Sequence, residues 1–277
     1  MSSNELRRVG FIGLGMMGMP MAQAIEQGGY PLSVWARRPE ILEVFGPEVI
    51  RSHTPAALAA QSDVICVCTF DAKSVEDVLF GSEGIANGAI PGTPVLIHST
   101  VSPEEVVAIG KRGAELGLAI IDAPVSGGAP AAQAGALTTM LGGTEVACDE
   151  VRDILATHSG RIVRLGDVGA GQKAKLINNA LLSAQGAVAH AEFELAHRIG
   201  LERAQLLEVL TTGSGRSFAI EMVGNSGKLE NIANGQAYPT LAKDARLLRE
   251  TAGSGPGDYL IDVADHFIAE MTAVRTV

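Results

Sequence analysis

The chain has 277 residues, of which 47% are hydrophobic and 4% aromatic, and its formal net charge is -10. This length allows two domains with a well-buried core, and the composition is that of a globular protein. The acidic residues are spread along the chain and no basic run occurs, so the charge offers no surface for nucleic acid or for an anionic membrane.

The N-terminal stretch MSSNELRRVGFIGLG passes quickly into an apolar, strand-like run and contains no signal-peptide pattern. No other stretch approaches the roughly 20 consecutive apolar residues that cross a bilayer. We therefore expect a cytoplasmic protein that does not act at a membrane.

The three cysteines, Cys66, Cys68 and Cys148, form no even disulfide framework and no C-x-x-C pair. Cys66 and Cys68 lie two residues apart on one face of a predicted strand, which favours a buried structural role over metal binding. The six histidines lack the spacing of metal ligands. We therefore expect no metal site.

Apolar runs alternate with helical patterns over residues 1–166, which is typical of a parallel sheet flanked by helices. Helix starts are marked between the runs, because Thr54 precedes Pro55 and Ser102 can form a capping box with Glu105. We predict an α/β, doubly wound domain over residues 1–166. Its predicted strands are 9–13, 32–36, 64–69, 95–99 and 118–123, with 137–141 and 161–166 completing the sheet.

After residue 166 the strand signal disappears and helical periodicity continues, so we predict an all-helical domain over residues 167–277. A long helix is expected from about Gln172 to Ile199, ended by Gly200. Its first half is apolar or small on nearly every face, so we expect it to be covered on all sides, by its own domain or by another subunit. The sequence GSGPG at 253–257 predicts a loop between the last two helices.

The segment GFIGLGMMGMPMA follows the first predicted strand and contains a G-x-G-x-x-G pattern. In a strand-turn-helix setting, Gly13 permits the tight turn, Gly15 lets the backbone approach a pyrophosphate, and Gly18 lets helix and strand pack closely. The alternative is a glycine turn that binds nothing. We assign cofactor binding to the whole block: Gly13, Leu14, Gly15, Met16, Met17 and Gly18.

The second predicted strand ends in VWARRPE, where Arg37 and Arg38 follow Ala36. A site for NAD would place Asp or Glu here to bind the ribose hydroxyls. A guanidinium pair instead offers charge and planar donors to a 2′-phosphate. We therefore expect NADP to be preferred over NAD; the alternative is that both arginines are ordinary solvated loop charges.

The sequence IDAPVSGG at 121–128 follows another predicted strand, at the sheet edge where such folds bind ligands. The hydroxyl of Ser126 and the N–H groups of Gly127 and Gly128 can bind a carboxylate. A simple glycine turn is the alternative for this stretch.

The segment GAGQKAKLINN opens the long helix with two lysines, Lys173 and Lys175. Residues four apart share a helix face and residues two apart do not, so Lys175 projects with Asn179 while Lys173 points to another side. Desolvation lowers the proton affinity of a lysine among amide and apolar side chains, which makes it usable as a general acid or base. A surface charge is the alternative for Lys175.

Four motifs together resemble the β-hydroxyacid dehydrogenase family, which includes 3-hydroxyisobutyrate dehydrogenases and tartronate semialdehyde (glyoxylate) reductases. They are the N-terminal glycine pattern, DAPVSGG, GAGQKAKLINN and LAKDARLL at 241–248, and they occur in the family's order along nearly the whole chain. The resemblance implies a Rossmann domain joined through a long helix to a helical domain that mediates oligomerisation. It implies a homodimer or a homotetramer.

The resemblance also implies roles for individual residues. Lys175 would be the catalytic acid/base, Asn179 would hold the substrate, and Asp244 would support the local structure. The substrate carboxylate would bind to Ser126, Gly127 and Gly128. The cofactor would further contact Thr69, Thr100 and Lys243.

We therefore predict an NADP-preferring oxidoreductase that moves a hydride between nicotinamide and a small β-hydroxy acid or semialdehyde acid. Two departures from the family bear on the substrate: Gln133 stands where several relatives carry a basic residue, and the family's C-terminal D-x-S/A motif is not found after the last helical pattern. One alternative is an imine reductase, since such relatives share the fold but commonly replace the residue at Lys175. Another is a catalytically silent dinucleotide-binding module.

Overall fold

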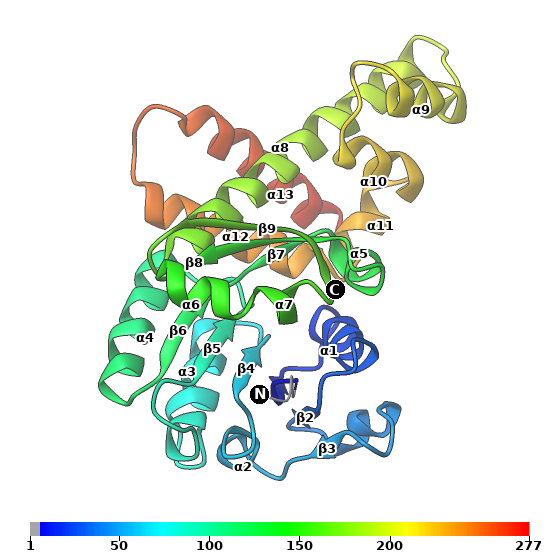
Figure 1. Ribbon diagram of the computed structural model, residues 1–277. Coiled ribbons are helices and arrows are strands. Elements are labelled where there is room, and N and C mark those ends of the chain that lie inside the picture. The colour runs from blue at the N-terminus through cyan, green and yellow to red at the C-terminus, as the bar shows by residue number, and fades with distance from the viewer. Residues whose placement is uncertain (1–5, 277) are drawn as a thin grey trace. The chain divides into compact units, whose positions relative to one another are not determined.

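The computed structural model describes residues 6–276 and divides into two compact units, Met1–Lys175 and Leu176–Val277. Residues 1–5, which belong to the stretch without a signal-peptide pattern, and Val277 lie outside the described residues. The first unit is an α/β domain and the second is helical (Figure 1), which confirms the predicted fold class. Within residues 6–276, no helix has the length and apolar character needed to cross a bilayer.

The first unit is built on a nine-stranded sheet with the order β3-β2-β1-β4-β5-β6-β8-β7, in which β9 also pairs with β8. The pairs among β1 to β6 are all parallel, whereas β8 is antiparallel to β6 and β7 and parallel to β9. The strands are β1 (Val9–Ile12), β2 (Leu32–Trp35), β3 (Ile50–Arg51), β4 (Val64–Val67), β5 (Pro94–Ile97), β6 (Ala119–Asp122), β7 (Val125–Ser126), β8 (Leu137–Gly142) and β9 (Ser159–Gly166).

All seven predicted strands are present, with ends that differ by at most two residues from the prediction. The sequence analysis missed β3 and β7, because a strand of two residues is too short to show an alternating pattern. It also gave no sign that β8 runs antiparallel to β6. The chain turns back through β7 and the short helix α5 (Gly128–Gln133), so β7 and β8 pair as neighbouring antiparallel strands.

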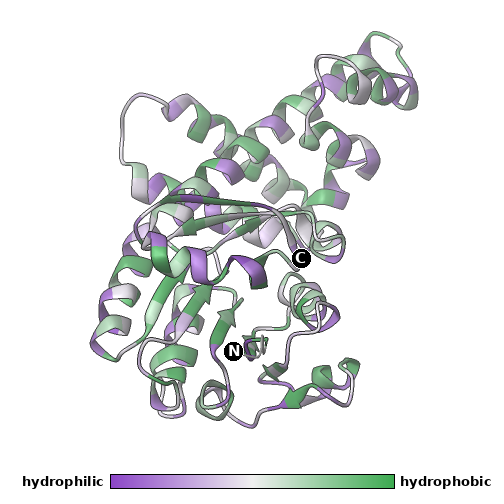
Figure 2. Cartoon of the chain, viewed as in Figure 1, coloured by the Kyte–Doolittle hydropathy of each residue, from purple (hydrophilic) through white to green (hydrophobic). Residues whose placement is uncertain are grey.

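Successive residues along the central strands pack into two separate apolar clusters. Cys66 and Leu96 belong to one cluster, and their neighbours Ile65 and Ile97 belong to the other, as the alternation of side chains across a sheet requires. The central strands are accordingly hydrophobic throughout (Figure 2). Helices α1 (Gly18–Gln27), α6 (Glu145–Glu150) and α7 (Arg152–Leu155) contribute to the first cluster, and α2 (Pro55–Ala59), α3 (Ala72–Phe80) and α4 (Pro103–Glu115) to the second.

Both predicted helix starts are confirmed. The hydroxyl of Thr54 accepts the Ala57 N–H at the start of α2. At the start of α4, the Ser102 hydroxyl accepts the Glu105 N–H, and the Glu105 carboxylate accepts the Ser102 N–H. Short 3-10 helices, η1 (Pro39–Val44) and η2 (Ile85–Asn87), complete the connections of this unit.

Cys66 and Cys68 both pack with the first apolar cluster, as expected for residues on one strand face. Burial raises the pKa of both thiols, that of Cys68 to about 12. Neither thiol is therefore ionised near neutral pH, which fits a structural role. Among residues 6–276, no group of three or more His, Cys, Asp or Glu side chains has the arrangement of a metal site.

The second unit consists of helices, and most of α8 (Ala170–Arg198) belongs to it. Gly200, with φ of +82°, follows α8 and allows the Leu201 N–H to bond back to the Ala196 carbonyl, so the helix ends where the sequence predicts. The loop at 253–257 separates the last two helices, also as predicted. The remaining helices are α9 (Arg203–Thr212), α10 (Phe218–Ser226), α11 (Leu229–Ala233), α12 (Tyr238–Ala252) and α13 (Asp258–Val274).

The core of the second unit forms where α8 packs against the C-terminal helices. Leu176 and Ala180 of α8 contact a cluster that includes Leu248 of α12 and Ile261 of α13. Further along α8, Gly186 lies directly against the ring of Phe267, where even a Cβ atom would collide. The close approach of α8 and α13 therefore depends on a residue without a side chain.

One face of α8 is apolar and exposed within the single chain. Its members are Ile177, Leu181, Val188 and Leu195, with Ile199 directly after the helix end, each 46% to 63% exposed. Their spacing of four and seven residues places them within about 40° of one another around the helix axis. Of the two predicted sources of cover for the first half of this helix, its own domain therefore leaves Ile177 and Leu181 exposed, and cover by another subunit stays a prediction.

Two histidines lie buried side by side in the first unit. The rings of His98 and His158 are edge to face, with centroids 5.8 Å apart, and neither Nε2 atom has a hydrogen-bond partner. His98 Nδ1 lies 2.8 Å from the Ala123 carbonyl oxygen, and His158 Nδ1 lies 3.1 Å from the Thr157 hydroxyl. Burial lowers the pKa of His98 to about 4 and that of His158 to about 3, so both rings are neutral at neutral pH.

We expect this pair to make the first unit sensitive to acid. A histidine with a lowered pKa in the folded state stabilises the fold fully above its unfolded-state pKa of about 6.5, and this stability is lost as pH falls toward the folded-state value. His158→Phe should remove part of that dependence. Between pH 7 and pH 4.5, the free energy of unfolding of the wild type should fall by about 2 kcal/mol more than that of His158→Phe.

Urea unfolding followed by circular dichroism at each pH measures this difference. His53→Phe is the matched control, because His53 is exposed, and it should retain the wild-type dependence. Parallel curves for wild type and His158→Phe would show that the buried pair does not take part in acid unfolding.

Candidate functional site

The glycine loop between β1 and α1 has the geometry that its spacing predicts. Gly13 has φ of +95°, and a Cβ there would collide with the Cys68 carbonyl. A Cβ at Gly18 would collide with the Gly13 carbonyl, so the helix and the loop touch through backbone atoms. Around Gly15, by contrast, nothing lies within 4 Å of the Cβ position. The loop is therefore packed tightly at its two ends and open at its centre, where a pyrophosphate can approach.

At the start of α1, the Met19 N–H donates to the Gly15 carbonyl, at 3.0 Å, and Pro20 has no N–H, which leaves the Gly18 N–H for a ligand. Met17 occupies the N-cap position, and no side chain caps the helix there. The unpaired N–H groups of a helix N-terminus attract an anion, because the helix dipole adds positive potential to the N–H donors. Together with the open centre of the loop, this end of α1 fits a dinucleotide phosphate.

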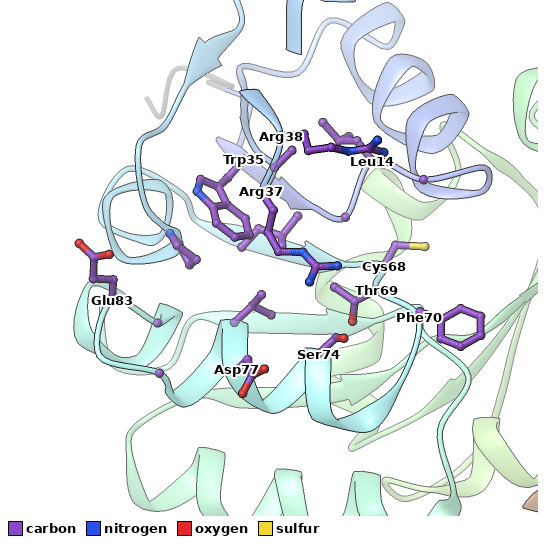
Figure 3. Close-up of a pocket in the computed structure, with 18 of the residues that line it drawn as sticks. Leu14, Trp35, Arg37, Arg38, Cys68, Thr69, Phe70, Ser74, Asp77 and Glu83 are labelled. Atoms are coloured by element: carbon purple, nitrogen blue, oxygen red, sulfur yellow. The ribbon is translucent and has the colours of Figure 1, made fainter. Parts of the chain in front are cut away.

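A cavity of about 480 Å³ lies beside the loop, at the carboxyl ends of β1, β2 and β4 (Figure 3). Among the predicted cofactor residues, it is lined by Gly13, Leu14, Gly15, Arg37, Arg38 and Thr69. Met16, Met17, Gly18, Thr100 and Lys243 were also assigned to the cofactor, and they are not among the lining residues. The first unit thus brings the glycine loop and the two arginines to one cavity.

Arg37 extends over this cavity toward Thr69, and Asp77 and Ser74 stand on α3 across from it (Figure 3). Asp77 is paired with Lys73, whose Nζ lies 2.6 Å from the carboxylate, so its charge is already compensated. The strand end itself carries Arg37 and Arg38 without a carboxylate between them and β2. A second carboxylate, that of Glu83, also lines the cavity, so its lining contains two arginines and two acidic residues.

A buried polar network joins the loops that follow β4 and β5. The hydroxyl of Ser99 accepts the Thr69 N–H at 2.8 Å and lies 3.2 Å from the Thr69 hydroxyl. The Ser99 carbonyl accepts the side-chain amide of Gln172, at 2.9 Å, and the Gln172 side-chain oxygen accepts the Val101 N–H, at 3.2 Å. Gln172 therefore binds the backbone on both sides of Thr100.

The first turn of α8 is bound by a carboxylate from the end of β6. Asp122 is fully buried and accepts the N–H groups of Gly169, at 2.7 Å, and of Gln172, at 2.8 Å. Burial raises the pKa of Asp122 to about 6, although these backbone donors oppose the rise. Gly142 and Gly171 lie so close that a Cβ at either would collide with the carboxylate. Asp122 thus caps α8 from a strand that is distant in the sequence. Its carboxylate fits because Gly142 and Gly171 have no side chains.

The two lysines of α8 differ as the helical spacing predicts. Lys173 is exposed, whereas Lys175 is only 9% exposed. Gln172, Lys175 and Asn179 share one buried face of the helix, three and four residues apart. Of the two amines, only that of Lys175 therefore lies on the buried side of α8.

Ser126, Gly127 and Gly128 lie at the end of β7 and the start of α5. Gly127 has φ of +131° and Gly128 has φ of +75°, conformations that disfavour any other residue. Both glycines are exposed, and no side chain caps α5. The stretch thus presents backbone N–H groups at the C-terminal side of the sheet.

In the second unit, Asn179 and Lys243 meet at a buried carboxylate. Asn179 donates its side-chain amide to Asp244, at 2.6 Å, and the Nζ of Lys243 lies 2.9 Å from the other oxygen of Asp244. The amide of Asn178 donates to the Asn179 oxygen, at 3.1 Å. Asp244 therefore fixes both Asn179 and Lys243, which agrees with the supporting role implied for it.

The sequence analysis overlooked two residues that organise the first unit's part of the site. Asp122 is the first residue of DAPVSGG and ends an apolar strand, and a lone carboxylate at that position is a recognisable signal. Gln172 sits within GAGQKAK, one turn before Lys175, and a single polar residue at the start of a buried helix gives a weaker signal. Neither residue has partners near it in the sequence, so their contacts depend on the fold.

Two family models match the chain. The NAD binding domain of 6-phosphogluconate dehydrogenase matches residues 8–166, and the NAD-binding domain of NADP-dependent 3-hydroxyisobutyrate dehydrogenase matches residues 169–256. Together the two matches cover the regions that contain all four sequence motifs.

Characterised relatives are similar over nearly the full length. The L-threonate dehydrogenase of Cupriavidus necator is 36% identical, over 94% of this chain and 88% of that protein. The 2-(hydroxymethyl)glutarate dehydrogenase of Eubacterium barkeri is 33% identical, over 90% of this chain and 83% of that protein. Among solved structures, a 3-hydroxyisobutyrate dehydrogenase of Mycobacterium tuberculosis with L-serine superposes with a TM-score of 0.79, at 27% identity, covering 97% of this chain and 98% of that one.

Proposed function

Because the chain belongs to the β-hydroxyacid dehydrogenase family of NAD(P)-dependent oxidoreductases, we propose that it interconverts a small β-hydroxy acid and its semialdehyde with Lys175 as general acid/base. The observation that carries this proposal is the contrast between the two lysines, since Lys175 is 9% exposed on a polar, buried helix face while Lys173 lies in solvent. A lysine buried on a polar helix face is a candidate for proton transfer.

The proposed chemistry divides between the cofactor and the chain. When bound, NADP supplies the hydride acceptor, and its reduced form the hydride donor. In the reducing direction, Lys175 donates a proton to the alkoxide oxygen that develops on the substrate; in the oxidising direction it removes the proton from the hydroxyl. Asn179, held by Asp244, orients the substrate oxygen. Ser126, Gly127 and Gly128 bind the substrate carboxylate through the hydroxyl and the N–H groups.

The substrate class follows from the relatives. L-threonate, 2-(hydroxymethyl)glutarate and 3-hydroxyisobutyrate are the substrates in the names of similar enzymes, and all three are hydroxy acids. A carboxylate with a hydroxyl nearby is their common element, and it matches the anion-binding stretch at the start of α5. We propose a substrate of this kind, with the size of its pocket set in part by Gln133 on α5.

We also propose that the functional division falls at residues 166 and 167, with NADP binding over 1–166 and a helical substrate and oligomerisation domain over 167–277. The boundary between the two family matches, at 166 and 169, supports it. The cytoplasmic location expected from the sequence stays a prediction.

Replacing Lys175 by Ala tests the proposed mechanism. Loss of the general acid should lower kcat for NADPH-dependent reduction of a semialdehyde or of glyoxylate by roughly 100- to 10,000-fold. The dissociation constant of NADPH, measured by its fluorescence, should remain within about threefold, because the adenosine part of the site lies elsewhere in the first unit. The measurement is steady-state oxidation of NADPH with a panel of small oxo acids.

Lys173→Ala is the matched control, since Lys173 is the neighbouring exposed amine, and it should keep wild-type turnover. A small primary amine added to Lys175→Ala should restore part of the activity. Equal turnover of Lys175→Ala and wild type would remove Lys175 from the mechanism, and turnover of a cyclic imine in place of every oxo acid would favour the imine reductase alternative.

NADP preference is proposed on the two arginines beside the cavity. Arg37→Ser/Arg38→Ser should raise KM for NADPH by roughly 10- to 100-fold, the loss of one or two charge-assisted hydrogen bonds. KM for NADH should change little, because NADH lacks the 2′-phosphate. Arg161→Ser, an exposed change on β9 away from the cavity, is the control. Equal losses with both coenzymes would show that the arginines do not select the phosphate.

The exposed apolar face of α8 supports a homodimer. Its five members form one straight stripe along the helix, and such a stripe is self-complementary when two copies meet around a two-fold axis. Large apolar side chains aligned on one helix face are costly to leave in water. We propose that a second copy of the chain covers this stripe.

Val188→Glu should weaken the dimer, because it places a charge in the centre of the stripe. Light scattering after size exclusion at micromolar concentration should give the monomer mass for this variant and at least the dimer mass for the wild type. Val146→Glu is the matched control, since Val146 is exposed in the first unit, outside the stripe. An unchanged mass for Val188→Glu would assign the stripe to another role.

A further inference from the structure

Gln172 lies on the helix face that carries the proposed acid/base. It is fully buried, and it precedes Lys175 by three residues and Asn179 by seven, so all three side chains project from the same side of α8. Gln172 carries no charge and has no chemistry of its own to offer a reducing or oxidising step. Gln172 is connected to the site through its hydrogen bonds.

Both polar atoms of the Gln172 side chain are used, and both bind the loop after β5. Its nitrogen donates to the Ser99 carbonyl, at 2.9 Å, and its oxygen accepts the Val101 N–H, at 3.2 Å. These partners flank Thr100, a residue that the family resemblance places in contact with the cofactor. The amide therefore holds the backbone of Thr100 from both sides.

The same residue is also fixed at its backbone. The Gln172 N–H donates to the buried carboxylate of Asp122, at 2.8 Å, so the end of β6 sets the position of the first turn of α8. On the other side, Ser99 binds the Thr69 N–H, at 2.8 Å, which brings in the end of β4. Gln172 thus links the ends of β4, β5 and β6 to α8, the helix that carries Lys175.

From this geometry we propose that Gln172 is a positioning residue for the reaction: its two side-chain hydrogen bonds set the separation between the Thr100 loop and the helix face of Lys175. The inference rests on the proposed function, because it assigns Gln172 to the placement of that amine. Hydride and proton transfer both require alignment of the reacting atoms, and a displacement of about 1 Å can cost roughly 100-fold in rate. Gln172 acts through Lys175, by holding its helix face against the Thr100 loop.

Gln172→Met tests the inference, because methionine has a similar length and volume but neither hydrogen bond. We expect kcat to fall roughly 10- to 100-fold, while KM for the oxo acid and the dissociation constant of NADPH, measured by fluorescence without turnover, change by less than about threefold. Gln172→Asn is a second variant, in case Gln172→Met does not fold. It keeps an amide that is one methylene too short to reach both partners, and it should show an intermediate loss of kcat.

Thr139→Val is the control for lost stability, since it removes another buried side-chain hydrogen bond of the first unit, that between Thr139 and Ser159, at 2.7 Å. It should lower the thermal midpoint to a similar extent and keep wild-type kcat. A Gln172 variant that loses stability but keeps kcat within about twofold would show that these hydrogen bonds serve the fold alone, and would overturn the inference.

A double-mutant cycle separates positioning from the proposed function. If Gln172 acts through Lys175, adding Gln172→Met to Lys175→Ala should lower the single-turnover rate by less than about threefold. Fully additive losses would overturn the positioning role and leave the role of Lys175 intact. If the single variant Lys175→Ala keeps wild-type turnover, both the proposed function and this inference are wrong.

Discussion

The start of α8 depends on one buried carboxylate. Without Asp122, the first N–H groups of a long helix would lie in the interior with no acceptor, and each unpaired group costs about 1 to 3 kcal/mol. The carboxylate comes from a strand that is distant in the sequence, so this anchor is present only where the end of β6 packs against the start of α8. The position of Lys175, two turns into the helix at most, follows from that single anchor.

The cofactor side of the first unit depends instead on positions that have no side chain. Gly13 and Gly18 bring backbone atoms of the loop, the helix and β4 into direct contact, and Gly15 leaves the space that a phosphate needs. Arg37 and Arg38 then stand at the end of the neighbouring strand, beside the same cavity. Gly13 and Gly18 are closely packed, and the space at Gly15 is open. The charged phosphates can therefore approach the uncharged backbone of the loop.

Much of this could be predicted from the sequence, because the signals were local. Apolar runs identified seven of the strands, capping residues located two helix starts, and the spacing of Lys173, Lys175 and Asn179 separated the exposed lysine from the buried one. The two-residue strands β3 and β7 carry too little pattern to be seen. Helical periodicity also could not show which apolar face of α8 its own chain leaves uncovered.

The contacts of Asp122, Gln172 and Asp244 could not be predicted from the sequence, for another reason. Each side chain bonds to residues 47 to 73 positions away, and nothing in a single sequence specifies such a pairing. The motifs containing these residues were recognised, but the polar residues between the obvious catalytic and glycine positions had no assigned partner. Local patterns thus identified the groups that we propose for the chemistry, and the fold was needed to identify the groups that hold them.

The glycines at 142 and 171, which border the Asp122 carboxylate, limit how this scaffold can diversify. A side chain at either position would enter the space of the carboxylate, so the joint between sheet and helix tolerates almost no variation. The segment from Ser126 to Gln133 is half exposed, and its constraint is confined to Gly127 and Gly128, whose positive φ angles disfavour other residues. On the proposed substrate role of this segment, an engineer who wished to accept a bulkier acid would therefore vary its exposed positions other than the two glycines, and leave the joint untouched.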